Sequence, residues 1–131
     1  VSNGLDLNNV RSGSISTVIS VIVLQHIPVY SIRHTLLSEF FRVLQPGGKL
    51  LFQMGAGLSL STPDGRPLAG YYEERLSADG TNGNFDVQVI SSEEIENDLR
   101  DIGFVNSTSQ ILSAFSDHQH DSWIYTEATK P

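Results

Sequence analysis

The sequence predicts a mixed α/β fold, and three observations carry this prediction. A run at 15–24 is rich in β-branched residues and apolar on both faces, which is typical of a strand buried inside a parallel sheet. A helical pattern at 31–44 and a second buried run at 49–54 follow it, so strand, helix and strand form one right-handed crossover. A second helical pattern from residue 91 and two later strand-like runs complete a single α/β domain over residues 1–131.

The first helix is expected to begin with Ser31 as its N-cap, because Pro28 ends the preceding strand and serine is a favoured capping residue. Residues 45–48, Gln-Pro-Gly-Gly, are expected to end it, since proline cannot continue a helix and glycine accepts positive φ. Its apolar side chains at helical spacing are Ile32, Leu36, Leu37, Phe40, Val43 and Leu44.

Residues 55–84 form a long, glycine-rich loop without a clear hydrophobic period. We expect part of it to be a hairpin or a loop that lines a site, with residues 71–76 as its best candidate for a short strand. The second helix is predicted from Ser91, where Ser-Ser-Glu-Glu supplies a cap and an acidic first turn. Strands over 104–115 and 122–129 are then expected to pair antiparallel.

The composition excludes several classes of protein. Eight basic and fifteen acidic residues give a net charge of −7, which disfavours binding to a nucleic-acid backbone. The longest apolar run, 18–24, is too short to cross a bilayer, and the absence of cysteine favours a cytoplasmic protein. Because the chain begins at Val1 and its only methionine is Met54, we expect that its true start is missing.

Two motifs carry a family resemblance. Residues 18–28 read Val-Ile-Ser-Val-Ile-Val-Leu-Gln-His-Ile-Pro, and residues 39–52 read Glu-Phe-Phe-Arg-Val-Leu-Gln-Pro-Gly-Gly-Lys-Leu-Leu-Phe. Together they resemble the C-terminal half of the class I S-adenosylmethionine-dependent methyltransferases, from that family's strand four onward. Residues 92–104 and 123–127 are similar to the family's last helix and last strand. The resemblance implies a partial Rossmann-like fold, with strands four to seven in a mixed sheet, flanking helices and an antiparallel last strand.

The resemblance also implies an activity, the transfer of a methyl group from S-adenosylmethionine to an acceptor that the sequence does not identify. The family's Gly-x-Gly turn after strand one has no counterpart here, so we expect no activity from this chain alone. Cofactor contacts implied by the resemblance fall on Gly4, Leu5, Ser20, Val21, Ile22 and His26. Ser20–Ile22 alternatively belong only to a hydrophobic strand.

His26 is the single candidate for a base or a substrate-orienting group, because imidazole titrates near neutral pH. Its alternative role is a hydrogen bond to the following helix. The catalytic residues are otherwise unknown. Tyr71, Tyr72 and Arg75 in the long loop would face the substrate pocket if the family architecture holds, and the alternative is packing within the loop.

Two further clusters have simpler interpretations. Glu39 and Arg42 lie three apart on one helix and are expected to pair with each other and to anchor the helix to the following turn. Residues 117–121 contain metal-ligand side chains, but we interpret them as a solvated turn and predict no metal site. These side chains are Asp117, His118, His120 and Asp121.

A competing hypothesis is a non-catalytic α/β module. In the complete family fold strand one pairs with strand four, so residues 17–23 here would present an open, apolar edge. Such an edge invites pairing with another chain. We therefore expect a homo-oligomer, a protein partner at this edge, or a missing N-terminal half that covers it.

Overall fold

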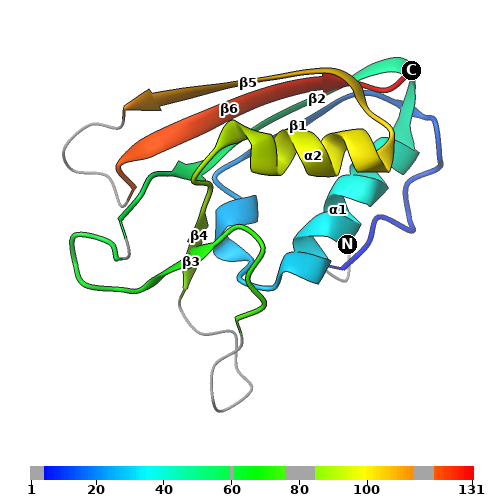
Figure 1. The fold of residues 1–131 in the computed structure, drawn as a ribbon. Helices are drawn as coiled ribbons and strands as arrows, with labels where there is room; N and C mark the ends of the chain where they lie inside the picture. The colour runs from blue at the N-terminus through cyan, green and yellow to red at the C-terminus, as the bar shows by residue number, and fades with distance from the viewer. Residues whose placement is uncertain (1–4, 60, 76–84, 114–119) are drawn as a thin grey trace.

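The computed structural model describes residues 5–59, 61–75, 85–113 and 120–131, and Figure 1 shows how their elements are arranged. In chain order these elements are β1 (Ile15–Val21), the 3-10 helix η1 (Leu24–His26), α1 (Tyr30–Val43), β2 (Leu44–Ala56), β3 (Leu68–Gly70), β4 (Asp86–Gln88), α2 (Ser92–Ile102), β5 (Val105–Ser113) and β6 (Ser122–Thr129). None of the helices in these ranges has both the length and the apolarity that crossing a bilayer requires.

The main sheet has the strand order β1-β2-β6-β5. β1 runs parallel to β2, and α1 forms the crossover between them. β6 is antiparallel to both of its neighbours, β2 and β5. This mixed sheet with flanking helices, including the antiparallel last strand, confirms the fold class predicted from the sequence.

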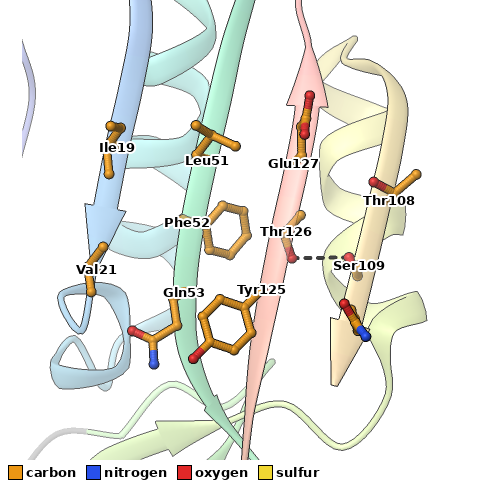
Figure 2. A pocket seen from close by; sticks show the side chains of 11 residues that line it. Ile19, Val21, Leu51, Phe52, Gln53, Thr108, Ser109, Tyr125, Thr126 and Glu127 are labelled. Atoms are coloured by element: carbon orange, nitrogen blue, oxygen red, sulfur yellow. Dashed lines mark hydrogen bonds between the residues drawn. The ribbon is translucent and has the colours of Figure 1, made fainter. Parts of the chain in front are cut away.

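The two faces of the sheet have different surroundings. Both helices lie on one face, where Leu50, Phe52 and Ile124 are buried in the apolar core. Side chains on the opposite face alternate with them along the strands, and there Ile19 and Tyr125 are largely exposed. No helix among the described residues covers that second face, so one side of the sheet is open (Figures 1 and 2).

The start of α1 differs from the prediction. The helix begins at Tyr30, with Val29 as an N-cap that makes no side-chain hydrogen bond. Ser31 is therefore inside the first turn, and its backbone N–H donates to the Glu74 side chain at 2.8 Å. A carboxylate from the long loop thus satisfies a free N–H of the helix, as a favourable charge at the positive end of the helix dipole.

The end of α1 lies close to the predicted position, but another residue caps it. The helix ends at Val43, and residues 45–48 already belong to the extended segment of β2, with Gly47 at a φ of 77°. Lys130 Nζ donates to the carbonyl oxygens of Phe41 and Leu44, both at 2.8 Å. A cation from the C-terminal end of the sheet therefore satisfies the last carbonyls of the helix.

The long loop contains a small parallel sheet where a hairpin was one expectation. β3 pairs in parallel with β4, Leu68 opposite Asp86 and Gly70 opposite Gln88. The predicted strand at 71–76 is wrong over its described part, because Tyr71 and Tyr72 leave β3 in a turn that directs their hydroxyls to α2. Residues 76–84 lie outside the described residues.

The prediction for α2 is confirmed in detail. Ser91 is the N-cap, and its side chain forms a capping box with Glu94. Gly103 ends the helix in the left-handed region at a φ of 114°. The strands that follow, β5 and β6, pair antiparallel as expected, although β5 is described only to Ser113 and residues 114–119 lie outside the described residues.

Glu39 and Arg42 pair as predicted, with the Arg42 Nε donating to Glu39 Oε1 at 2.7 Å. The segment that they anchor is different from the expected one. The Leu7 N–H donates to Glu39 Oε2 at 2.8 Å, and Arg42 donates to the carbonyl oxygens of Leu7 and Val10. The pair therefore holds the segment before β1 against α1.

The Glu39 carboxylate should make the fold acid-sensitive. Hydrogen bonds from Arg42 and from the Leu7 N–H lower the pKa of Glu39 to about 2. The stabilisation is complete above the unfolded pKa, about 4.3, and is lost as the pH falls through the folded value. We expect Glu39→Gln to lower the urea midpoint at pH 7 and to reduce the further loss of stability between about pH 4.5 and 2. Circular dichroism during urea unfolding measures both effects.

The matched control is Glu96→Gln, which removes the same charge from α2 at a side chain with no such partners among the described residues. This control should keep the acid-dependent loss of stability seen in the unmodified chain. An equal change in both variants would assign the acid sensitivity to net charge and not to the Glu39 contacts.

Candidate functional site

β1 and β2 end side by side, and the candidate site lies at this carboxyl end of the parallel pair. Val21 is opposite Gln53, and the Ile22 N–H donates to the Gln53 carbonyl at 3.2 Å. Ligands of open α/β sheets bind outside the carboxyl ends of the parallel strands. The first expectation from the resemblance, that Ser20–Ile22 lie at such an end, therefore agrees with the topology.

The chain turns sharply after β1. Ile22 has a φ of 56°, a left-handed conformation that is strained for a β-branched residue. The turn leads into η1, which ends at His26, so the strand predicted to reach residue 24 stops at Val21. Strained backbone of this kind persists where the surrounding structure holds it, and it is common at binding sites.

His26 does not bond to the following helix, which was its alternative role. Its Nδ1 lies 2.7 Å from Oδ1 of Asp86, the first residue of β4. The His26 side chain is 50% exposed, whereas the Asp86 side chain is 3% exposed. A half-exposed imidazole is therefore held by a buried carboxylate at the mouth of the candidate site.

A second histidine lies on the other side of the same carboxylate. His120 Nε2 is 3.9 Å from Asp86 Oδ2, and the His120 side chain is fully buried. The ring packs against Gly55 of β2 and meets the Trp123 ring edge-on at 5.3 Å. The sequence interpretation of this segment as a solvated turn is wrong at His120, because β2 has a glycine there that leaves room for the ring. Asp117 and His118 lie outside the described residues.

Several buried polar atoms without a hydrogen-bond partner lie near this end of the sheet, with Ser20 on the helix-covered face and Gln53 on the open face. Apart from Arg33 Nε, the unpaired buried atoms among the described side chains are Ser20 Oγ, Gln53 Oε1, Asp86 Oδ2, Gln88 Oε1, and Nδ1 and Nε2 of His120. Burying such atoms unpaired is costly, and the partner that compensates the cost in native structures is a bound water, an ion or a ligand.

A groove of about 480 Å³ lies on the open face of the sheet (Figure 2). Ile19, Val21 and Leu51 form its apolar side, Tyr125 and Glu127 of β6 lie in its middle, and residues 108–110 of β5 form its far side. Of the predicted cofactor residues only Val21 lines it, and Figure 2 shows the helices behind the sheet, away from the groove. The groove is therefore a feature of the uncovered face, and Gln53 is the one residue that both lines it and carries one of the unpaired polar atoms described above.

The loop residues predicted to bind substrate are engaged in packing contacts. Tyr71 is buried, and its hydroxyl donates to Asp98 at 2.9 Å. The exposed Tyr72 donates to the Glu94 carbonyl at 3.0 Å, while Arg75 pairs with Glu73. These contacts correspond to the packing alternative, and a role in substrate binding stays a prediction.

The two remaining predicted contacts precede β1. Gly4 lies outside the described residues. Leu5 is exposed, and the segment after it is tied to α1 through Leu7, so its contact with a cofactor stays a prediction.

Three residues that the sequence interpretation missed are central to the structure. Asp86, His120 and Asp98 are all buried carboxylates or imidazoles. Asp98 belongs to the acidic sequence of α2, yet it accepts hydrogen bonds from Tyr30 and Tyr71. The sequence does indicate that Asp98 is buried. Asp98 lies three residues after Ile95, and helical spacing therefore places it on the same inward face as Ile95.

The strand order resembles part of a known fold. A parallel β1-α1-β2 unit, followed by a helix and an antiparallel pair whose last strand inserts next to β2, is consistent with a partial Rossmann-like methyltransferase fold. Residues 1–52 match the sequence-family model of a methyltransferase domain. No match was found among curated protein sequences.

Solved structures share this fold along nearly the whole chain. A SAM-dependent methyltransferase from Methanosarcina mazei superposes with a TM-score of 0.66 at 18% identity, over 98% of this chain and 65% of that one. A SAM-dependent methyltransferase from Thermotoga maritima, possible histamine N-methyltransferase, gives 0.62 at 16% identity, over 99% and 62%. A phosphoethanolamine N-methyltransferase 2 from Haemonchus contortus, in complex with S-adenosylhomocysteine, gives 0.60 at 18%, over 93% and 35%.

These findings confirm the resemblance to the class I S-adenosylmethionine-dependent methyltransferases that residues 18–28 and 39–52 carry. The chain has the fold of that class, and it spans less than two thirds of the length of these three structures.

The contact between Gly55 and His120 gives a test of the site's packing. A Cβ at Gly55 would overlap the His120 ring, so we expect Gly55→Ala to destabilise the fold by about 2 kcal/mol. In a His120→Ala background the same substitution should cost much less, because the clashing ring is absent. Urea unfolding of the four variants of this cycle measures the coupling.

Gly70→Ala is the matched control for this cycle. A Cβ at Gly70 meets only the end of the flexible Glu73 side chain at 3.3 Å, so we expect little change in stability. Equal costs of Gly55→Ala with and without His120 would contradict the packing described here.

Proposed function

We propose that this chain is the strand-four-to-strand-seven part of a methyltransferase catalytic domain that transfers a methyl group from S-adenosylmethionine. In this proposal the cofactor lies against Ser20, Val21 and Ile22, and His26 faces the methyl acceptor. The observation that carries it is the group of unpaired, buried polar atoms at the carboxyl end of β1 and β2.

The chemistry of the site supports this proposal. Methyl transfer depends mainly on holding the acceptor in line with the methyl group, so a rigid sheet end with few functional side chains is sufficient. The sulfonium donor supplies an electrophilic methyl carbon when it is bound. The residues of this chain would position the donor and the acceptor and would hold the acceptor's proton, with the paired His26 and Asp86 as the titratable groups proposed for this role.

For the identity of the methyl acceptor, the net charge of the chain is the property from which we argue. A net charge of −7 is unfavourable for approach to a nucleic-acid backbone, so we propose a small molecule or a protein as acceptor. The chain contains no Gly-x-Gly turn of the kind that cradles the cofactor in this class, and we expect its own affinity for the cofactor to be weak.

The proposal is tested by asking whether S-adenosylhomocysteine binds weakly at the residues named above. We expect millimolar S-adenosylhomocysteine to shift the backbone NMR signals of Ser20–Ile22, His26 and 55–57, while signals of β5 stay in place. Thermal stabilisation should follow, because a ligand that binds only the folded state raises its stability. Absence of shifts, or shifts confined to the open sheet face, would contradict cofactor binding at this site.

A second candidate function is self-association through β1. The outer edge of β1 pairs with no other described strand, and the strand carries neither a charged residue nor a proline that would protect an edge. Ile19 is 68% exposed, and Val21, Ile22 and Val23 extend the apolar surface. Such a surface on a β edge favours the addition of a strand from another chain.

The sequence of β1 favours a second copy of this chain as the added strand. An antiparallel pairing about Val18 places Ser16 opposite Ser20 and Thr17 opposite Ile19 of the other copy. Two serines thus face each other on one side of the sheet and two β-branched residues on the other, and each pair occurs twice about the dyad, as in an isologous interface. The pairing would join two four-stranded sheets into one.

A charge on this edge should separate the copies. We propose that the chain forms a dimer at tens of micromolar and that Ile19→Lys converts it to a monomer, because the pairing places two lysines near the dyad. Light scattering after size exclusion measures the mass. Ile90→Lys is the matched control, since Ile90 is also exposed but lies before α2, and it should leave the dimer intact. A monomeric unmodified chain would contradict the proposal.

A further inference from the structure

Asp86 lies between two imidazoles at the carboxyl end of the sheet. Its Oδ1 is 2.7 Å from His26 Nδ1, and its Oδ2 is 3.9 Å from His120 Nε2. A buried carboxylate needs a partner that compensates its charge. Among the described residues His26 is the one side chain that hydrogen-bonds Asp86, so the two form a unit.

The geometry determines which nitrogen of His26 faces outward. Nδ1 is directed to the buried carboxylate, and the neutral ring therefore carries its proton on Nδ1 as the donor of that bond. Nε2, on the other side of the ring, then has a free lone pair on the half-exposed part of the side chain. A carboxylate that orients a histidine through one nitrogen leaves the other ready to accept a proton.

His120 strengthens this assignment because it stays neutral. Burial lowers the pKa of His120, and His26 and Arg66 act in the same direction, while Asp86 and Asp121 oppose the change. Both ring nitrogens of His120 are buried without a hydrogen-bond partner. Because His120 makes no hydrogen bond to Asp86, His26 is the imidazole that this carboxylate orients.

We propose that Asp86 is a positioning residue that holds His26 in the Nδ1–H tautomer, so that His26 Nε2 takes the proton of the methyl acceptor; this rests on the methyl-transfer function proposed above. In this step the acceptor oxygen or nitrogen bonds to the methyl carbon, the carbon–sulfur bond of the sulfonium donor breaks, and its electron pair stays on sulfur. The O–H or N–H proton moves to Nε2, and Asp86 compensates the resulting imidazolium. The acceptor class is an alcohol, a phenol or a neutral amine.

The tautomer of His26 tests the proposal without cofactor or acceptor. In ring ¹H–¹⁵N correlation spectra of the 131-residue chain at about pH 9, where histidine is neutral, we expect His26 to carry its proton on Nδ1. Asp86→Asn should move the dominant tautomer to Nε2–H, because the asparagine amide can donate to Nδ1. Loss of one ring signal in His26→Asn assigns the resonance. An Nε2–H tautomer in the unmodified chain overturns the proposal.

Asp121→Asn is the matched control, since Asp121 is a neighbouring carboxylate that accepts from Ser59 and not from His26. It should leave the tautomer unchanged, and an equal effect of both variants would overturn the role of Asp86. If Asp86→Asn does not fold, the spectrum of the unmodified chain decides alone. A failure here is distinct from a failure of the proposed function, which is read from the shifts that S-adenosylhomocysteine causes at Ser20–Ile22.

Discussion

β1 and β2 run parallel, with residues 17–21 paired continuously to residues 49–53, and this pairing determines where the other features of the molecule lie. Because α1 returns the chain to the start of β2, both strands end at the same edge, where Val21 lies opposite Gln53. The small β3–β4 sheet joins that edge through the bridge between Ala56 and Val89, and it places Asp86 next to His26. The same pairing leaves the outer side of β1 as an open edge.

The helices cover only one face of this sheet, and the core reflects that arrangement. On the covered face, alternate residues of β2 and β6 are fully buried against α1 and α2. On the open face, the strands present a mixed surface whose apolar part is centred on Ile19, Val21 and Leu51. A sheet with one apolar region uncovered is stable but has a surface suited to further protein contacts.

The sequence predicted the elements whose signals are local and missed the contacts that join distant segments. The capping box at Ser91 and the left-handed Gly103 follow from residues within one helix, and both predictions are confirmed. The N-terminus of α1 was misjudged because its partner, Glu74, is 43 residues away. The buried positions of Asp86 and His120 likewise depend on a glycine in β2 and on a loop strand, which no periodic pattern reveals.

The open edge and the polar site are physically linked because both use β1. Antiparallel pairing about Val18 would place Ile15 of a second copy opposite Val21, so the segment before β1 of one copy would adjoin the carboxyl end of β1 in the other. A dimer of this kind would border the proposed cofactor site without covering His26, which ends η1 and faces Asp86 of β4. Association and ligand binding should therefore influence each other mainly at Val21 and Ile22, where the strained turn would either be supported by the second copy or be left free to adapt to a ligand.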